Sequence, residues 1–120
     1  MRVEDIVSCL QAEPLVICDE EIFKRDYPYG FATDLMSDAL AMIQHSPEST
    51  VLITGLANVQ TLRTAEMLDM NLIVFVRGKR LSDEILEIAK ENNMNLFTTE
   101  HTMYSACGCL YSHGLRGINE

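Results

Sequence analysis

Three short segments of this 120-residue chain contain residue types that could bind a small anion. They are Thr54-Gly55-Leu56-Ala57-Asn58, Arg77-Gly78-Lys79-Arg80 and Thr98-Thr99-Glu100-His101-Thr102. Each precedes a predicted helix, whose free N–H groups and positive dipole end favour an anion. The middle segment also collects three basic residues in a chain with 9 Lys and Arg against 18 Asp and Glu. The pattern predicts a phosphate or carboxylate site formed by Thr54, Gly55, Asn58, Arg77, Gly78, Lys79, Thr99 and Thr102.

The basic segment also has an ordinary structural interpretation. Gly78 and Lys79 are common turn residues, and the arginines on either side could be solvated or could offset neighbouring acids. The chain contains neither G-x-G-x-x-G nor G-x-x-x-x-G-K-[ST], so a classical dinucleotide site and a P-loop are not expected. Both interpretations of the segment stay open at this level.

Two acidic residues offer a different chemistry. Asp34 and Asp38, four residues apart, would share one face of a helix, where paired carboxylates can hold Mg²⁺ or position a general base. The alternative is that Asp34 caps the helix while Asp38 is a solvated acid in its first turn. An enzyme that uses Asp34, Asp38 and the loop from Arg77 to Lys79 is therefore one possible function.

The four cysteines predict free thiols, with no metal site, no disulfide and no cofactor. On a helix, Cys107 and Cys109 would point about 200° apart, so they cannot chelate one ion together. Cys109 and His113 could supply two ligands, but two more would have to come from elsewhere. Cys18 and Cys107 lie in apolar settings that suit buried thiols.

Apolar patterns predict the elements that would position these residues. Apolar runs at 15–18, 51–53 and 72–76 are typical of strands buried on both faces, and predict strands over 15–18, 51–54 and 72–76. Residues 95–98 are predicted to form a fourth strand. Apolar residues at helical spacing predict helices over about 3–10, 34–43, 58–69, 82–92 and 102–113. Asn58, Ser82 and Thr102 are expected to cap the last three of these helices. The segment 23–33 is expected to form a loop or a small irregular strand.

From residue 50 onward, strands and helices alternate, which favours an α/β fold with right-handed crossovers. We expect one three-layer α/β/α domain over residues 1–120, with a mainly parallel sheet of four to five strands. In such a sheet, ligands bind outside the carboxyl ends of the strands. The three segments described first would meet at that edge.

The composition limits the possible partners. A net charge of −9 disfavours sequence-independent binding to nucleic acid, because phosphate backbones would be repelled. No window holds the roughly 18 apolar residues that a membrane helix requires. The acidic start from Met1 to Asp5 has no following signal core, so we expect a cytoplasmic protein with no membrane contact.

Five segments of the chain resemble the DRTGG domain family: 34–38, 51–60, 73–79, 84–93 and 102–108. The resemblance covers about residues 15–117. It implies a fold similar to the non-catalytic N-terminal domain of HPr kinase/phosphorylase, and a regulatory rather than catalytic role. In fused relatives the domain is associated with adenine-nucleotide regulation and dimerisation. Where the family has Thr-Gly-Gly, this chain has Val76-Arg77-Gly78.

These observations predict a regulatory or ligand-binding module that senses a nucleotide or another phosphorylated small molecule, as a homodimer or a complex subunit. Tyr27, Tyr29 and Phe31 alternate along the chain, so an extended strand would place all three on one face suited to a two-fold interface. Standalone relatives tend to accompany iron-only hydrogenases and ferredoxin-like proteins. A scaffold or accessory protein of such a redox system, without a small ligand, is the alternative function.

Overall fold

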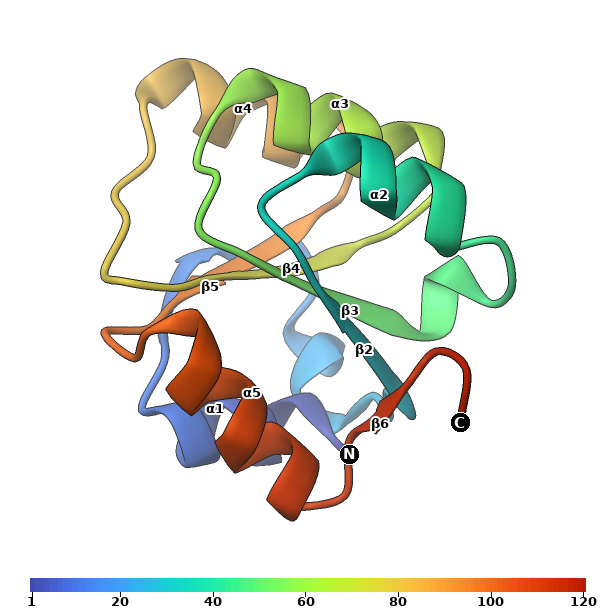
Figure 1. The fold of residues 1–120 in the computed structure, drawn as a ribbon. Helices are drawn as coiled ribbons and strands as arrows, with labels where there is room; N and C mark the ends of the chain where they lie inside the picture. The colour runs from blue at the N-terminus through green and yellow to red at the C-terminus, as the bar shows by residue number, and fades with distance from the viewer.

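A six-stranded sheet runs through the middle of the molecule in the computed structural model, which describes all 120 residues (Figure 1). The strand order is β1-β5-β4-β3-β2-β6. β1 pairs antiparallel with β5, and the other four pairs are parallel. The strands are β1 (Glu13–Val16), β2 (Tyr29–Ala32), β3 (Thr50–Thr54), β4 (Leu72–Phe75), β5 (Asn95–Thr98) and β6 (Arg116–Gly117).

The α/β fold is confirmed, whereas the predicted strand number is too small and the sheet is mixed. β6 was not predicted, and β2 lies in segment 23–33, which was expected to form a loop or a small irregular strand. β6 has only two residues, and every residue of β2 is half-buried rather than buried. Neither segment has the continuous apolar run that a strand buried on both faces requires.

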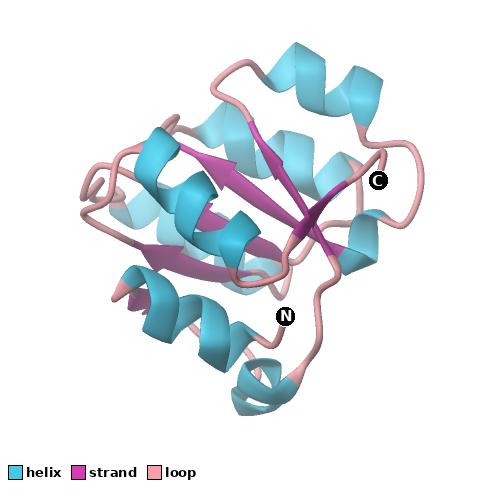
Figure 2. Ribbon diagram, turned by 60° about the horizontal axis from the view of Figure 1, so that its bottom comes forward, coloured by secondary structure: helices cyan, strands magenta, loops and turns pink.

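Two layers of helices cover the sheet. Figure 1 shows α2, α3 and α4 on one face, and α1 and α5 on the other, and Figure 2 shows helices on both sides of the strands. None of the five α-helices has the length and apolar character needed to cross a bilayer. The helices are α1 (Val3–Leu10), α2 (Met36–Met42), α3 (Val59–Met67), α4 (Asp83–Glu91) and α5 (Met103–Ser112), with short 3₁₀ turns η1 (Glu20–Lys24) and η2 (Pro47–Ser49).

The sheet separates two hydrophobic cores of 15 buried residues each. Successive residues of one strand point to opposite faces, so Ile53 packs toward α1 and α5 while Leu52 packs toward α2, α3 and α4. Burial on both faces explains why the central strands are apolar at nearly every position.

Three of the predicted helix caps are confirmed. The side chains of Asn58, Ser82 and Thr102 accept hydrogen bonds from the backbone N–H three residues later, at 3.0, 3.3 and 3.5 Å. The second helix differs from the prediction, because it begins at Met36 and Asp34 makes no cap. The Asp34 carboxylate instead contacts the end of β3.

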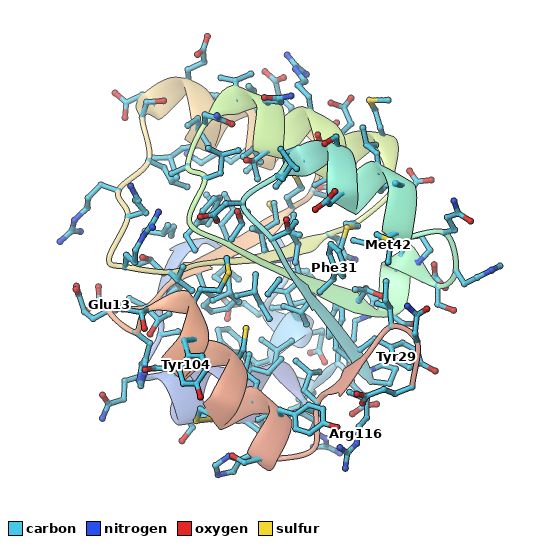
Figure 3. All side chains as sticks on the ribbon, in the orientation of Figure 1. Glu13, Tyr29, Phe31, Met42, Tyr104 and Arg116 are labelled. Carbon is cyan, nitrogen blue, oxygen red and sulfur yellow. A yellow bond between two sulfur atoms is a disulfide. The ribbon has the colours of Figure 1, made fainter.

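The predicted aromatic face on segment 23–33 does not form. Tyr27 is fully buried, and its hydroxyl donates a 2.6 Å hydrogen bond to Asn71 Oδ1. Tyr29 and Phe31 lie on β2, which is flanked by β3 and β6, and both are half-buried (Figure 3). The alternation of aromatic residues is real, but β2 begins only at Tyr29, so Tyr27 does not share its face.

The expectation that all four cysteines are free is also wrong. A disulfide joins Cys9 of α1 to Cys109 of α5, with an S–S distance of 2.04 Å. The two residues are 100 positions apart in the chain, and local sequence spacing could not show that their helices pack together. Cys18 and Cys107 are free thiols, but neither is buried as expected: Cys18 is exposed and Cys107 is half-buried.

Candidate functional site

The three predicted loop segments meet at the carboxyl ends of the strands. Thr54 at the end of β3 pairs with Phe75 of β4, which pairs with Thr98 of β5. The N–H groups of Arg77 and Gly78 donate to the carbonyls of His101 and Thr99, at 2.9 and 2.8 Å. The loop after β4 is thereby tied to the loop after β5.

Arg77 lies at the centre of this edge. Its guanidinium is directed at Gly55, with Nη2 3.4 Å from the Gly55 carbonyl oxygen and 3.9 Å from Asp34 Oδ2. A Cβ atom at Gly55 would collide with the guanidinium, so the glycine makes room for this close approach. The side chains of Arg77 and Asp34 are both about half exposed, at 49% and 47%. Solvent can therefore reach the pair from one side.

The turn that carries Arg77 has an unusual backbone. Arg77 and Gly78 both have φ +64°, in the left-handed region. Glycine adopts this conformation freely, whereas a residue with a Cβ is strained by roughly 1–2 kcal/mol. The fold therefore holds Arg77 in a costly conformation that directs its side chain over Gly55.

Asp34 has a role that the sequence did not indicate. Its Oδ1 accepts hydrogen bonds from the Gly55 N–H at 2.6 Å and from the Thr54 hydroxyl at 3.2 Å. A carboxylate of the protein thus occupies the strand-end amide that an anionic ligand would use. Asp38 lies exposed on α2, and no group of potential metal ligands in the molecule includes either aspartate.

Most of the other predicted site residues make internal hydrogen bonds. Thr99 is buried, and its hydroxyl donates to the Leu10 carbonyl at 2.7 Å. Asn58 and Thr102 are helix caps. The groups open to a ligand include the guanidinium of Arg77, the half-exposed Lys79 and the N–H groups of Val59 and Gln60. These two N–H groups lie in the first turn of α3 and have no partners within the helix, whereas the Thr61 N–H donates to the Asn58 cap.

The charges at this edge favour the start of α3 over the start of α4. The first turn of α4 contains Asp83 and Glu84, which already complement its dipole. The first turn of α3 contains no acidic residue. The Glu100 carboxylate lies against Gly78 and offsets part of the positive charge of the basic loop.

None of the four surface hollows of the molecule lies at this edge. The largest, about 490 Å³, lies at the opposite edge, where β4 and β5 begin, and is lined by Asn71, Asn93 and Asn95 among others. Asn95 Oδ1 accepts from the Cys18 N–H at 2.9 Å, which ties the hollow to the chain after β1. Single asparagines in the connections before β4 and β5 and at the start of β5 gave no sequence signal for this cluster.

Two sequence comparisons, one against models of known families and one against curated proteins, find no match. Among solved structures, the chain is similar to the CBS and DRTGG domains of the regulatory region of Clostridium perfringens pyrophosphatase, complexed with its activator diadenosine tetraphosphate. The TM-score is 0.70 at 21% identity, covering 98% of this chain and 51% of the other. The chain thus spans about half the length of that neighbour, and the likeness shows a related fold.

Proposed function

We propose that this protein is a non-catalytic regulatory module of the DRTGG type that binds an adenine nucleotide or a similar phosphorylated molecule at the carboxyl edge of its sheet. The observation that carries the proposal is the exposed guanidinium of Arg77, held over Gly55 beside the start of α3. The fold it shares with a nucleotide-activated regulatory region supports the class of ligand.

The proposed binding step exchanges one anion for another. A phosphate group would take the Gly55 N–H and the Arg77 guanidinium, and the Asp34 carboxylate would move out to solvent. Charge-assisted hydrogen bonds to phosphate are stronger than neutral ones. Asp34 would give up its hydrogen bonds from the Gly55 N–H and the Thr54 hydroxyl. Losing its ion pair with Arg77 costs little, because that pair is open to solvent.

A thermal-shift titration tests this proposal. Diadenosine tetraphosphate, ATP, ADP and AMP should raise the melting temperature in a saturable way, because a ligand that binds only the folded state must stabilise it. Inorganic phosphate at the same concentration is the control for a nonspecific anion effect. If no nucleotide shifts the transition more than inorganic phosphate does, the nucleotide proposal is wrong.

Asp34 provides a variant that should strengthen nucleotide binding. Asp34→Asn removes the competing carboxylate and its charge while keeping the side-chain shape. The variant should bind nucleotide more tightly than the wild type, and Asp38→Asn on α2 is the matched control with no expected change. A loss of affinity in Asp34→Asn would mean that the carboxylate contacts the ligand directly, as in the alternative of an enzyme that uses Asp34.

We further propose that the module is a homodimer, with α2 and α3 as the contact surface. Four large apolar side chains are exposed on or beside these packed helices: Leu35, Leu40, Met42 and Met67, the last at 72% exposure. Light scattering at tens of micromolar should give twice the chain mass, and Leu40→Lys should give the monomer mass. A monomer for the wild type would contradict the dimer without affecting the nucleotide site.

The alternative of an accessory protein for a redox system predicts a different result. Such a protein would show no nucleotide shift and would instead bind a protein partner such as a ferredoxin-like electron carrier. The disulfide between Cys9 and Cys109 is the one feature of the molecule that favours this alternative, since its formation depends on the redox state of the surroundings.

A further inference from the structure

A cluster of metal-ligating side chains lies away from the strand-end edge, between α1 and α5. Cys9, Cys109 and His113 each present a ligand atom, and these atoms lie within 4.8 Å of one another. Nδ1 of His113 is 3.6 Å from Cys9 Sγ and 4.0 Å from Cys109 Sγ. We propose that Cys9, Cys109 and His113 bind one Zn²⁺ ion when the disulfide is reduced, and that oxidation to the disulfide releases it.

The spacing on both helices supports this site. Cys109 and His113 are four residues apart at the end of α5, so both point to the same side. Asp5 and Cys9 have the same spacing on α1, and both line a hollow of about 320 Å³ that His113 also borders. The two helices pack directly against each other. The hollow provides space for a water molecule or the Asp5 carboxylate as a fourth ligand.

The distances are close to those of a zinc site. With metal–ligand bonds of about 2.0–2.3 Å in a tetrahedron, ligand atoms are roughly 3.5–3.8 Å apart. The two distances from His113 to the sulfur atoms are already near this range. Only the two sulfur atoms, bonded at 2.04 Å, must separate. Two thiolates and an imidazole are a ligand set that zinc prefers.

His113 has a second contact that would orient it. Its Nδ1 lies 2.8 Å from the Cys109 carbonyl oxygen. Metal-bound histidines commonly donate their other ring N–H to a backbone carbonyl, which fixes the ring. The distances to the two sulfur atoms are those of Nδ1, so zinc binding at this nitrogen requires His113 to exchange its contact with the carbonyl for the metal. Coordination through Nε2 would instead require the ring to turn.

Zinc binding requires that the Cys9–Cys109 disulfide is first reduced, and an external thiol is the reductant. Two thiol molecules reduce the Cys9–Cys109 disulfide, giving two cysteine thiols and the disulfide of the reductant. Zn²⁺ then replaces the two thiol protons, which go to solvent. In the reverse direction, a small-molecule disulfide accepts two electrons from the two thiolates and, with two protons from solvent, leaves as two thiols. The Cys9–Cys109 disulfide forms again, and zinc keeps too few ligands to be held.

The test compares the two redox states of the untagged protein. We expect the reduced wild type to retain about one zinc ion per chain after gel filtration, by elemental analysis and native mass spectrometry, and the oxidised protein to retain none. With Co²⁺ in place of zinc, the reduced protein should show thiolate-to-cobalt charge-transfer bands. A reduced wild type that is folded by circular dichroism yet retains no zinc would overturn the proposal.

Two variants separate the site from incidental binding. His113→Ala changes an exposed residue and should weaken zinc binding at least about tenfold, in a chelator competition. Cys107→Ser is the control, because this free thiol lies on the same helix but outside the cluster, and its affinity should match the wild type. Equal zinc affinities for His113→Ala and Cys107→Ser would also overturn the proposal. The nucleotide titration does not depend on either outcome.

Discussion

At the scale of single residues, Arg77 combines a strained backbone with the contact that carries the proposed function. Its φ of +64° is a conformation that only glycine adopts without cost. The fold is therefore tolerating this strain at the point where the side chain reaches Gly55 and Asp34. Strain of this kind is often found where a side chain must be held in position for a ligand.

This backbone gives a prediction about stability. The free energy of unfolding of Arg77→Gly should be about 1 kcal/mol higher than that of Arg77→Ala. Glycine relieves the left-handed strain and alanine does not, so the glycine variant should be the more stable of the two. Both variants lose the same half-exposed ion pair, so that loss cancels in the comparison. Urea unfolding at pH 7 measures the difference. Equal stabilities would show that the turn relaxes when the arginine is removed.

Tyr27 gives a prediction about pH. Burial raises the pKa of its phenol above 10, although Arg25 and the hydrogen bond to Asn71 act in the opposite direction. Above pH 10 the unfolded chain loses this proton while the folded protein keeps it, so the free energy of unfolding falls as the pH rises through that window. Tyr27→Phe has no phenol at this position, so its free energy of unfolding should fall less than that of the wild type above pH 10.

The same variant should behave differently at neutral pH. Tyr27→Phe leaves Asn71 Oδ1 without its donor and should cost about 1 kcal/mol of unfolding free energy at pH 7. Urea unfolding of wild type and variant, followed from pH 7 to about 11, should therefore show a difference that shrinks above pH 10. A constant difference across this range would mean that Tyr27 ionises normally in the folded protein.

At the scale of elements, the predictable parts were those that depend on local pattern. The strand at 95–98 has the predicted bounds, and the helix caps Asn58, Ser82 and Thr102 follow from residue type and position. Burial on both faces makes the central strands apolar, so their sequences are informative. β6 was missed because its two residues pair with β2 only after α5 has returned the chain to that edge.

The cap of α3 gives a prediction that is independent of any ligand. Asn58→Ala removes the hydrogen bond to the Thr61 N–H and the contact with the Thr61 hydroxyl, and should cost about 1 kcal/mol of unfolding free energy. Asn58→Asp restores an acceptor at the cap and should recover most of it. If Asn58→Ala unfolds at the same denaturant concentration as the wild type, the cap is not contributing.

The candidate site could be predicted only in part, because only some of its contacts depend on local sequence pattern. Parallel strands place their carboxyl ends at one edge, so the three loop segments meet as expected. The contact of Asp34 with the end of β3 and the pairing of Cys9 with Cys109 join residues 21 and 100 positions apart. Contacts of this kind depend on how elements pack, and no spacing rule in a single sequence predicts them.

At the scale of the whole molecule, the disulfide joins the first and last helices. A link that closes a loop of 100 residues restricts the unfolded chain strongly, by about 4–5 kcal/mol in the chain-entropy model. With a chelator present, Cys9→Ser should therefore unfold at a lower urea concentration than the oxidised wild type, and reduction of the wild type should have the same effect. Cys107→Ser should change little. Identical unfolding of Cys9→Ser and wild type would mean that the disulfide is absent in solution.

The nucleotide affinity of Arg77→Gly tests the central claim most directly, because glycine suits the backbone at this position and the guanidinium is lost with the side chain. Isothermal titration with the nucleotide that gives the largest thermal shift measures it, with the wild type in parallel. We predict saturable binding by the wild type and a Kd about 10–150-fold higher in the variant, equivalent to about 1.5–3 kcal/mol for one charge-assisted hydrogen bond. An unchanged Kd, or a wild type that binds no nucleotide, would contradict the proposed site.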